Sequence, residues 1–174
     1  MLDGFYGSYY NLNQLVFDAF DAPVSIIGIF FGASYAVNAT AYSAAEFFSS
    51  RFGKRNTMLG SMLIEAGLFM ILPWFASNPL CLFGLSMVLC FLPEVVYITS
   101  ENLIQDAIAD DLRATILSVA SLVRALFSAM FFSIFGYVLG LYPIQIALGV
   151  IGAIAIAITA VVSLKMVGIH VSKN

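Results

Sequence analysis

The chain has 174 residues, of which 61% are hydrophobic and only 10% are charged. A soluble domain carries about 25% charged residues. A chain of this composition cannot cover its surface with polar groups, so we expect an integral membrane protein. The formal net charge of −3 and the lack of a basic stripe argue against a nucleic-acid partner. Cys81 and Cys90 share one apolar segment, where we expect small buried hydrophobes and not a disulfide or a metal pair.

Apolar segments follow one another along almost the whole chain. A membrane-spanning helix needs about 20 mostly apolar residues. Residues 1–20 carry several tyrosines and amides and predict a partial span with a polar face. Full spans are predicted at residues 23–50, 56–76, 79–106, 111–141 and 143–167. The expected fold is all-α, a polytopic membrane helix bundle with five full spans and one partial span.

Basic residues fall in alternate connections between these spans. The connections at residues 20–22, 77–79 and 141–143 contain no Lys or Arg. The other connections and the C-terminal tail carry Arg51, Lys54, Arg55, Arg113, Lys165 and Lys173. Because cytoplasmic loops carry an excess of Lys and Arg, we expect a cytoplasmic C-terminus, with the chain in the plasma membrane.

Small residues recur at the spacing of helix packing faces. Gly28 and Gly32 form one GxxxG pair, and Gly136 and Gly140 form another. The last span has a run of such residues, at Gly149, Gly152, Ala153 and Ala157. Small residues let helix backbones approach closely in lipid, so we expect a compact bundle.

Three ionisable residues lie well inside predicted spans, where charge is costly and suggests function. With a rise of about 1.5 Å per residue, Glu65 lies roughly 15 Å from Arg55, and Arg124 roughly 16 Å from Arg113. Glu94 falls at a similar depth, after Pro93, which frees a backbone carbonyl. We therefore expect Glu94 to pair with Arg124.

Polar residues form stripes at helical spacing on three of the spans. The stripes are Tyr35, Asn38, Tyr42 and Glu46; Glu94, Tyr97, Ile98 and Glu101; and Ser118, Ser121, Arg124 and Ser128. Such stripes are typical of the walls of a solute pathway. The alternative is that these groups bond neighbouring carbonyls and fix helix packing, and both interpretations stay open.

Residues that would support catalysis are not found in the sequence. There is no phosphate-binding glycine loop and no metal-ligand spacing, and the single histidine is His170. We expect no enzyme activity, no cofactor and no metal site.

The segment Arg113-Ala-Thr-Ile-Leu-Ser118, preceded by Tyr97 and Asn102, resembles the junction of the tenth and eleventh helices of major facilitator superfamily (MFS) transporters. Arg51-Phe-Gly-Lys-Arg55 resembles the D-R-x-G-R-R loop between their eighth and ninth helices, with Ser50 in place of the acidic residue. Residues 14–28 are similar to the seventh helix leading into the eighth.

This resemblance implies that the chain is the C-terminal six-helix half of such a transporter, without the start of the seventh helix. It implies a partner, the missing N-terminal half, and transport of a small organic solute by alternating access, most like drug and metabolite exporters. Helices of the seventh, eighth, tenth and eleventh type would line the cavity, and the ninth and twelfth would face lipid. Glu65, on the ninth, receives no role.

The candidate residues fall into two groups. The expected substrate pathway comprises Gln14, Tyr35, Asn38, Tyr42, Glu94, Tyr97, Ser121, Arg124 and Ser128, with Glu94 and Glu101 as candidates for proton coupling. The loop signature comprises Arg51, Gly53, Lys54, Arg55, Asn102 and Arg113. Two alternatives remain: a sugar or organic-anion uptake carrier in which Arg124 binds the substrate, and a multi-span scaffold that transports nothing.

Overall fold

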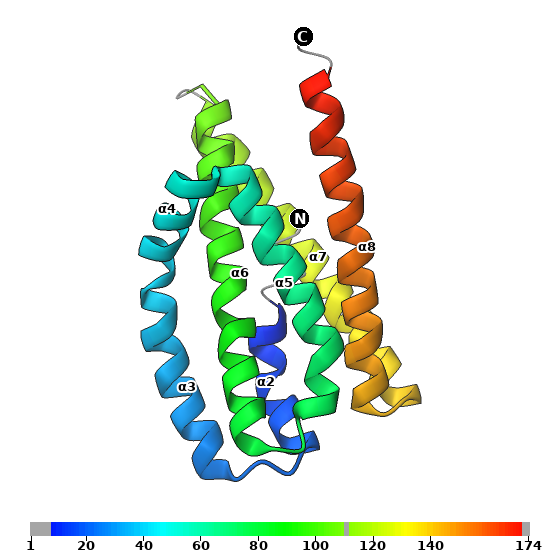
Figure 1. Ribbon diagram of the computed structural model, residues 1–174. Helices are drawn as coiled ribbons and strands as arrows, with labels where there is room; N and C mark the ends of the chain where they lie inside the picture. Colours follow the sequence, from blue (N-terminus) through cyan, green and yellow to red (C-terminus); the bar gives the residue numbers. More distant parts are fainter. Residues whose placement is uncertain (1–7, 110–111, 172–174) are drawn as a thin grey trace.

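The computed structural model describes residues 8–109 and 112–171, with side chains described for residues 10–109 and 112–164. All regular structure in these ranges is helical (Figure 1). The helices are α2 (Ser8–Ala19), α3 (Val24–Ala39), α4 (Ala41–Phe52), α5 (Lys54–Phe75), α6 (Pro79–Ala107), α7 (Arg113–Leu141) and α8 (Ile144–Val171). Expectations for residues 1–7, for Lys173 and for the side chains of Lys165 and His170 lie outside the described residues.

Four helices, α5 to α8, are each long and apolar enough to cross a membrane. The pair α3 and α4 meets the same test when its two parts are taken together. The prediction of an all-helical fold is therefore confirmed, and the described residues hold four or five segments that are suited to crossing a membrane. At about 1.5 Å per residue, the 12 residues of α2 are too short to span alone.

The predicted helix over residues 23–50 is not continuous but bends by 44° between α3 and α4. The break is at Thr40, whose hydroxyl donates a 2.7 Å hydrogen bond to the carbonyl of Val37. A threonine that bonds back to a carbonyl one turn earlier competes with the helix ladder and bends the helix. The polar stripe that we expected on one helix is consequently divided between two axes.

Helix α5 lies between α6 and α8 and contacts both extensively (Figure 1). Met62 and Ala66 of α5 form a buried cluster with Val96 of α6 and Ala155 of α8. The opposite face of α5 is exposed at apolar residues, among them Leu63, Ile64 and Trp74. The helix therefore combines a face buried in the bundle with a face suited to lipid.

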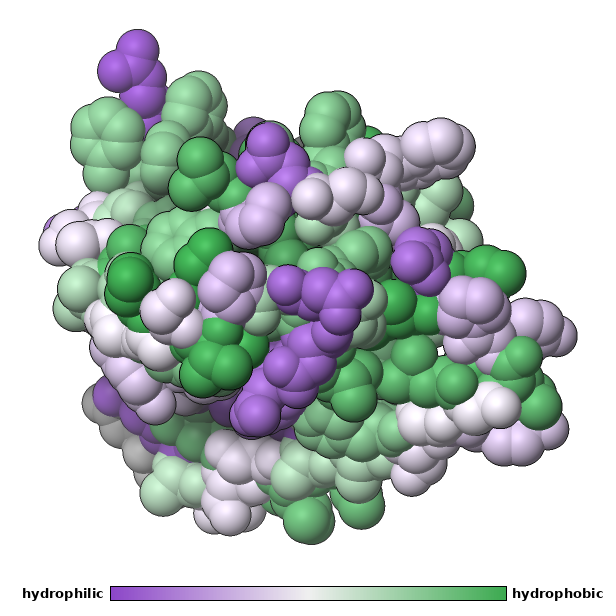
Figure 2. Space-filling view, turned by 90° about the horizontal axis from the view of Figure 1, so that it is seen from below, coloured by the Kyte–Doolittle hydropathy of each residue, from purple (hydrophilic) through white to green (hydrophobic). Residues whose placement is uncertain are grey.

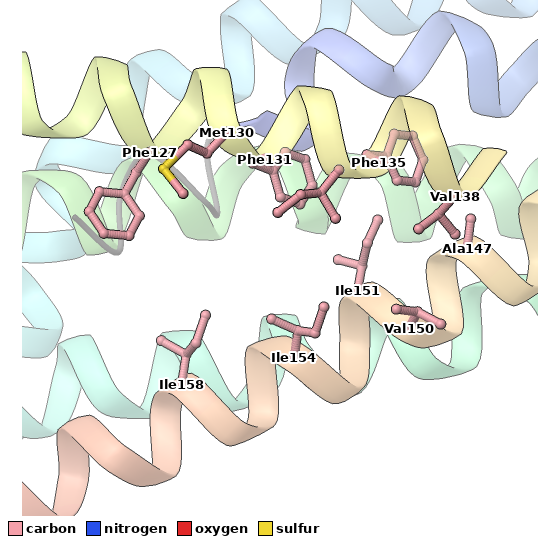
Figure 3. Close-up of a pocket in the computed structure, with 11 residues that line it drawn as sticks. Phe127, Met130, Phe131, Phe135, Val138, Ala147, Val150, Ile151, Ile154 and Ile158 are labelled. Carbon is pink, nitrogen blue, oxygen red and sulfur yellow. The ribbon is translucent and has the colours of Figure 1, made fainter. Parts of the chain in front are cut away.

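Helix α7 is the least enclosed of the long helices, since only 11% of its most apolar 18-residue stretch is buried. An apolar groove of about 180 Å³ separates it from α8. The side chains of the two helices point toward one another across this groove (Figure 3). Its lining includes Phe127, Met130, Ile154 and Ile158 and offers almost no polar surface. The groove therefore lacks polar groups that would orient a solute.

Close helix packing through glycine is found at Gly152, where α8 crosses α5. A methyl group at this position would lie 2.7 Å from Cγ of Met70 and 3.1 Å from its backbone nitrogen. At Gly28, Gly32, Gly136, Gly140 and Gly149 a methyl group would meet nothing within 4 Å. The packing role predicted for these five glycines is therefore not realised within the described chain, because the neighbouring helices do not cover them.

The two ends of the bundle differ in their connections. The α4–α5 and α6–α7 connections, which carry the basic residues, lie at the end where α8 finishes (Figure 1). At the other end Asn78 caps α6 by accepting hydrogen bonds from the backbone N–H groups of Leu80 and Cys81. Seen from this second end, apolar residues make up most of the surface, and hydrophilic residues form small groups (Figure 2).

The contact at Gly152 predicts an asymmetric effect of enlarging glycines. Gly152→Val should lower the free energy of unfolding by about 1–3 kcal/mol, because the added side chain would meet the α5 backbone at Met70 and overpacking forces backbone shifts. Gly140→Val is the matched control on α7 and should have little effect. Thermal unfolding of the two variants in detergent measures the difference, and equal melting temperatures would contradict the α5–α8 contact.

Candidate functional site

A charged cluster joins α6 and α7. Arg124 of α7 lies 3.6 Å from the carboxylate of Glu101, measured from Nη2 to Oε1. Its guanidinium carbon lies 4.4 Å from the centroid of the Tyr97 ring. Tyr97 and Glu101 are one turn apart on α6 and therefore share a face. The side chains of Arg124 and Glu101 are 20% and 26% exposed, so the pair is largely withdrawn from the surface.

The partner of Arg124 differs from the one that we expected. We predicted Glu94, but the ion pair is with Glu101, and Glu94 is not within ion-pair distance among the described residues. The physical reason is side-chain direction, since helical side chains tilt toward the N-terminus of their own helix. The long side chain of Arg124 therefore extends toward the start of α7, where the last turns of α6 lie. The sequence-based depth estimate used only the rise per residue along each helix and did not include the length and direction of the Arg124 side chain.

The distance between Arg124 and Glu101 is that of an ion pair without a direct hydrogen bond. A charge-assisted N–H···O bond is typically about 2.7–2.9 Å long, and the 3.6 Å contact exceeds this. The cation over the Tyr97 ring adds an attraction that strengthens when the site is dry. Arg124 and Glu101 therefore form an ion pair that has no short hydrogen bond between these two side chains.

A polar groove lies on the other side of α6, against α4. It has a volume of about 370 Å³, within the range of small-molecule sites. Its lining consists of Tyr42, Glu46, Ser49, Ser50, Lys54, Ile98 and Asn102. Ile98 and Asn102 are each the next residue after a member of the Arg124 cluster. Helix α6 therefore presents one face to each of the two polar regions.

The remaining predicted pathway residues are more dispersed. Tyr35 is exposed and packs edge-on against Tyr10, with ring centroids 6.1 Å apart. Asn38 and Glu94 are half-buried, and Gln14 is exposed on α2. On α7, Ser121 is exposed one turn before Arg124, and Ser128 is half-buried one turn after it.

The loop signature has a direct structural basis in Gly53. This residue ends α4 with φ +84° and ψ 144°, a conformation that favours glycine. The following Lys54 forms an ion pair with Asp106 near the end of α6. Asp106 was not predicted as a partner, although the alternation of connections already placed both residues at one end. Both groups are substantially exposed, so the pair orients the connection more than it stabilises the fold.

The two cysteines have different environments. Cys90 is buried, as predicted, and its sulfur accepts a 3.0 Å hydrogen bond from the side-chain amide of Asn13. Cys81 is exposed, so the prediction that it is buried was wrong. Residues nine positions apart lie on opposite faces of an α-helix at 3.6 residues per turn, and only one of the two can face the core.

No protein-family model matches the chain, and no curated protein or solved structure is significantly similar to it. The fold and the polar clusters define a class. Over its described residues the chain is helical, with four or five segments suited to crossing a membrane and with charged residues inside the helix bundle.

The cluster predicts a specific energetic coupling. Arg124→Gln and Glu101→Gln should be non-additive in unfolding free energy by about 0.5–3 kcal/mol, the range for residues in one charged network. Arg124→Gln and Glu94→Gln should be additive within about 0.5 kcal/mol. Two double-mutant cycles in detergent measure both couplings. If Arg124 were coupled more strongly to Glu94 than to Glu101, the ion pair predicted from the sequence, Glu94 with Arg124, would be correct.

Proposed function

We propose that the chain forms the C-terminal-type six-helix half of an MFS-like transporter that moves a small organic solute across the plasma membrane by alternating access. The observation that carries the proposal is the Tyr97–Glu101–Arg124 cluster, which lies between two apolar helices. Charged residues within such helices are expensive, and they mark solute or ion pathways.

The exposure of α7 supports the same proposal. The helix carries Ser121 and Arg124 but is little covered by the rest of the described chain. A second six-helix unit against this side would enclose the cluster. Substrate sites of transporters built from repeats lie at such an interface. In this arrangement the C-terminus is cytoplasmic, in keeping with the basic connections at the same end.

Each residue of the cluster has a distinct role in the proposal. Glu101 is the first candidate for proton coupling, because its protonation would cancel the charge that holds Arg124. Arg124 would then be available to an anionic group of the solute. Glu94, two turns before Glu101 on nearly the same face of α6, is the second candidate. The direction favoured is export.

A specific observation also favours a second function, uptake of an organic anion. The guanidinium of Arg124 is the cation of the cluster and lies over an aromatic ring, a setting that suits recognition of a carboxylate. A third possibility, a scaffold that transports nothing, requires that the polar regions stay closed to water.

Water access separates transport from a scaffold. In a Cys81→Ser background, cysteines at Tyr42 and Ser121 should react with a polar, impermeant thiol reagent in intact membranes, because both positions border the polar regions. Ile64→Cys on the exposed apolar face of α5 is the control and should not react. Absence of labelling at Tyr42 and Ser121 from either side would favour the scaffold.

Flux measurements distinguish the two transport functions. In inverted vesicles from cells that produce the full chain, an imposed pH gradient should drive movement of the cationic dye ethidium. Glu101→Gln should reduce the gradient-dependent rate by roughly tenfold or more, a change of about 1.4 kcal/mol in the barrier. Asp18→Asn, at an exposed position of α2 outside the lining of the polar groove, is the control.

The contrary results are equally defined. If benzoate moves and ethidium does not, with loss in Arg124→Gln and retention in Arg124→Lys, the chain is an anion carrier. If Glu101→Gln leaves the pH dependence intact while Glu94→Gln removes it, proton coupling belongs to Glu94.

A further inference from the structure

Glu65 is a buried carboxyl group that neither polar region uses. It lies on α5 in the middle of the bundle and is 0% exposed. Neither of its carboxylate oxygens has a hydrogen-bond partner in the described part of the chain. In hydrocarbon an ionised carboxylate without partners is so costly that such groups take up a proton instead.

The surroundings of Glu65 offer no positive charge. Helix α5 packs against α4, α6 and α8. The ionisable residues of α6 nearest this level of the hairpin are Cys90 and Glu94, neither of which is a cation at neutral pH. Helix α4 contributes Glu46 and Arg51, both of which are exposed. The described side chains of α8 include no ionisable group. A proton is therefore the ligand that can neutralise this site.

A hydrogen-bond acceptor for the acid is available on α6. Pro93 has no N–H, so the carbonyl of Leu89, four residues earlier, lacks its normal helix partner. Helices α5 and α6 form a hairpin, in which Glu65 lies ten residues before Phe75 and Leu89 lies ten residues after Pro79. Equal counts from the turn put both residues at the same level of the hairpin.

We propose that Glu65 is a proton-binding site, distinct from the Arg124 cluster, in which the neutral carboxylic acid donates its hydrogen to the Leu89 carbonyl and fastens α5 to α6. This hydrogen bond would satisfy both buried groups, since the acid needs an acceptor and the carbonyl needs a donor. The site follows from the burial and helix geometry of α5 and α6 and does not depend on solute transport.

The same chemistry makes Glu65 a modification site for apolar carbodiimides. The acid proton is transferred to a carbodiimide nitrogen while a carboxyl oxygen adds to the central carbon. The resulting O-acylisourea rearranges to a stable N-acylurea. All atoms of both reactants are retained and nothing is oxidised or reduced. A lipid-soluble reagent is required, because the site is closed to water.

Labelling and infrared spectroscopy test the site in the full-length protein. Dicyclohexylcarbodiimide should form an adduct located on Glu65 by mass spectrometry of the wild type in membranes, and a water-soluble carbodiimide should not. At neutral pH the wild type should show a carboxylic-acid carbonyl band that Glu65→Gln lacks and Glu46→Gln retains. Because labelling is read on the wild type, a variant that fails to fold leaves the test intact.

The bond to α6 has its own test. Pro93→Ala supplies the missing N–H, which competes with the acid for the Leu89 carbonyl, so the hydrogen bond of the acid should weaken and its band should shift to higher frequency. An unchanged band would overturn the hydrogen bond. No adduct on Glu65, or no difference between the wild-type and Glu65→Gln bands, would overturn the proton site itself.

Discussion

The cost of charge and of unpaired polar groups in hydrocarbon is the constraint on which the rest of this structure depends. A bundle made of 61% hydrophobic residues can hide its backbone by forming helices, but each ionisable side chain must find its own solution. Arg124 lies against a carboxylate and an aromatic ring, and Lys54 forms an ion pair with a carboxylate at the helix ends. No described side chain supplies Glu65 with a hydrogen bond, and in our proposal Glu65 keeps its proton. Two of these charged contacts also join helices: Arg124 and Glu101 connect α7 with α6, and Lys54 and Asp106 connect α5 with α6.

The helical fold was predictable from the sequence because it depends on segment length and mean hydropathy. The turns at Asn78 and Pro143 were also predictable, because a helix-capping asparagine and a proline determine the backbone conformation of their own short segments. The bend at Thr40 was missed because a threonine inside an apolar run gives no signal until its hydroxyl is seen to bond back to Val37. The glycine spacing was also misleading, because among the described glycines Gly152 alone has a neighbouring helix within contact of an added methyl group.

The candidate site was predictable in its membership but not in its pairing. Tyr97, Glu101 and Arg124 follow from polar residues at helical spacing on apolar helices. The choice of Glu101 over Glu94 depends on how far a long side chain extends along its helix and on how α7 is shifted against α6. Neither quantity can be counted from residue positions. The hydrogen bond between Asn13 and Cys90 is of the same kind, since it joins residues 77 positions apart.

The spacing of the two carboxylates on α6 has a consequence for how α7 can move. Glu94 and Glu101 are seven residues apart, which places them on nearly the same face at a separation of about 10 Å along the axis. A shift of α7 by two helical turns would bring Arg124 from Glu101 to Glu94. Residues 95–100 of α6 include no carboxylate, so a cation on α7 would meet an acidic side chain of α6 at two registers that are two turns apart.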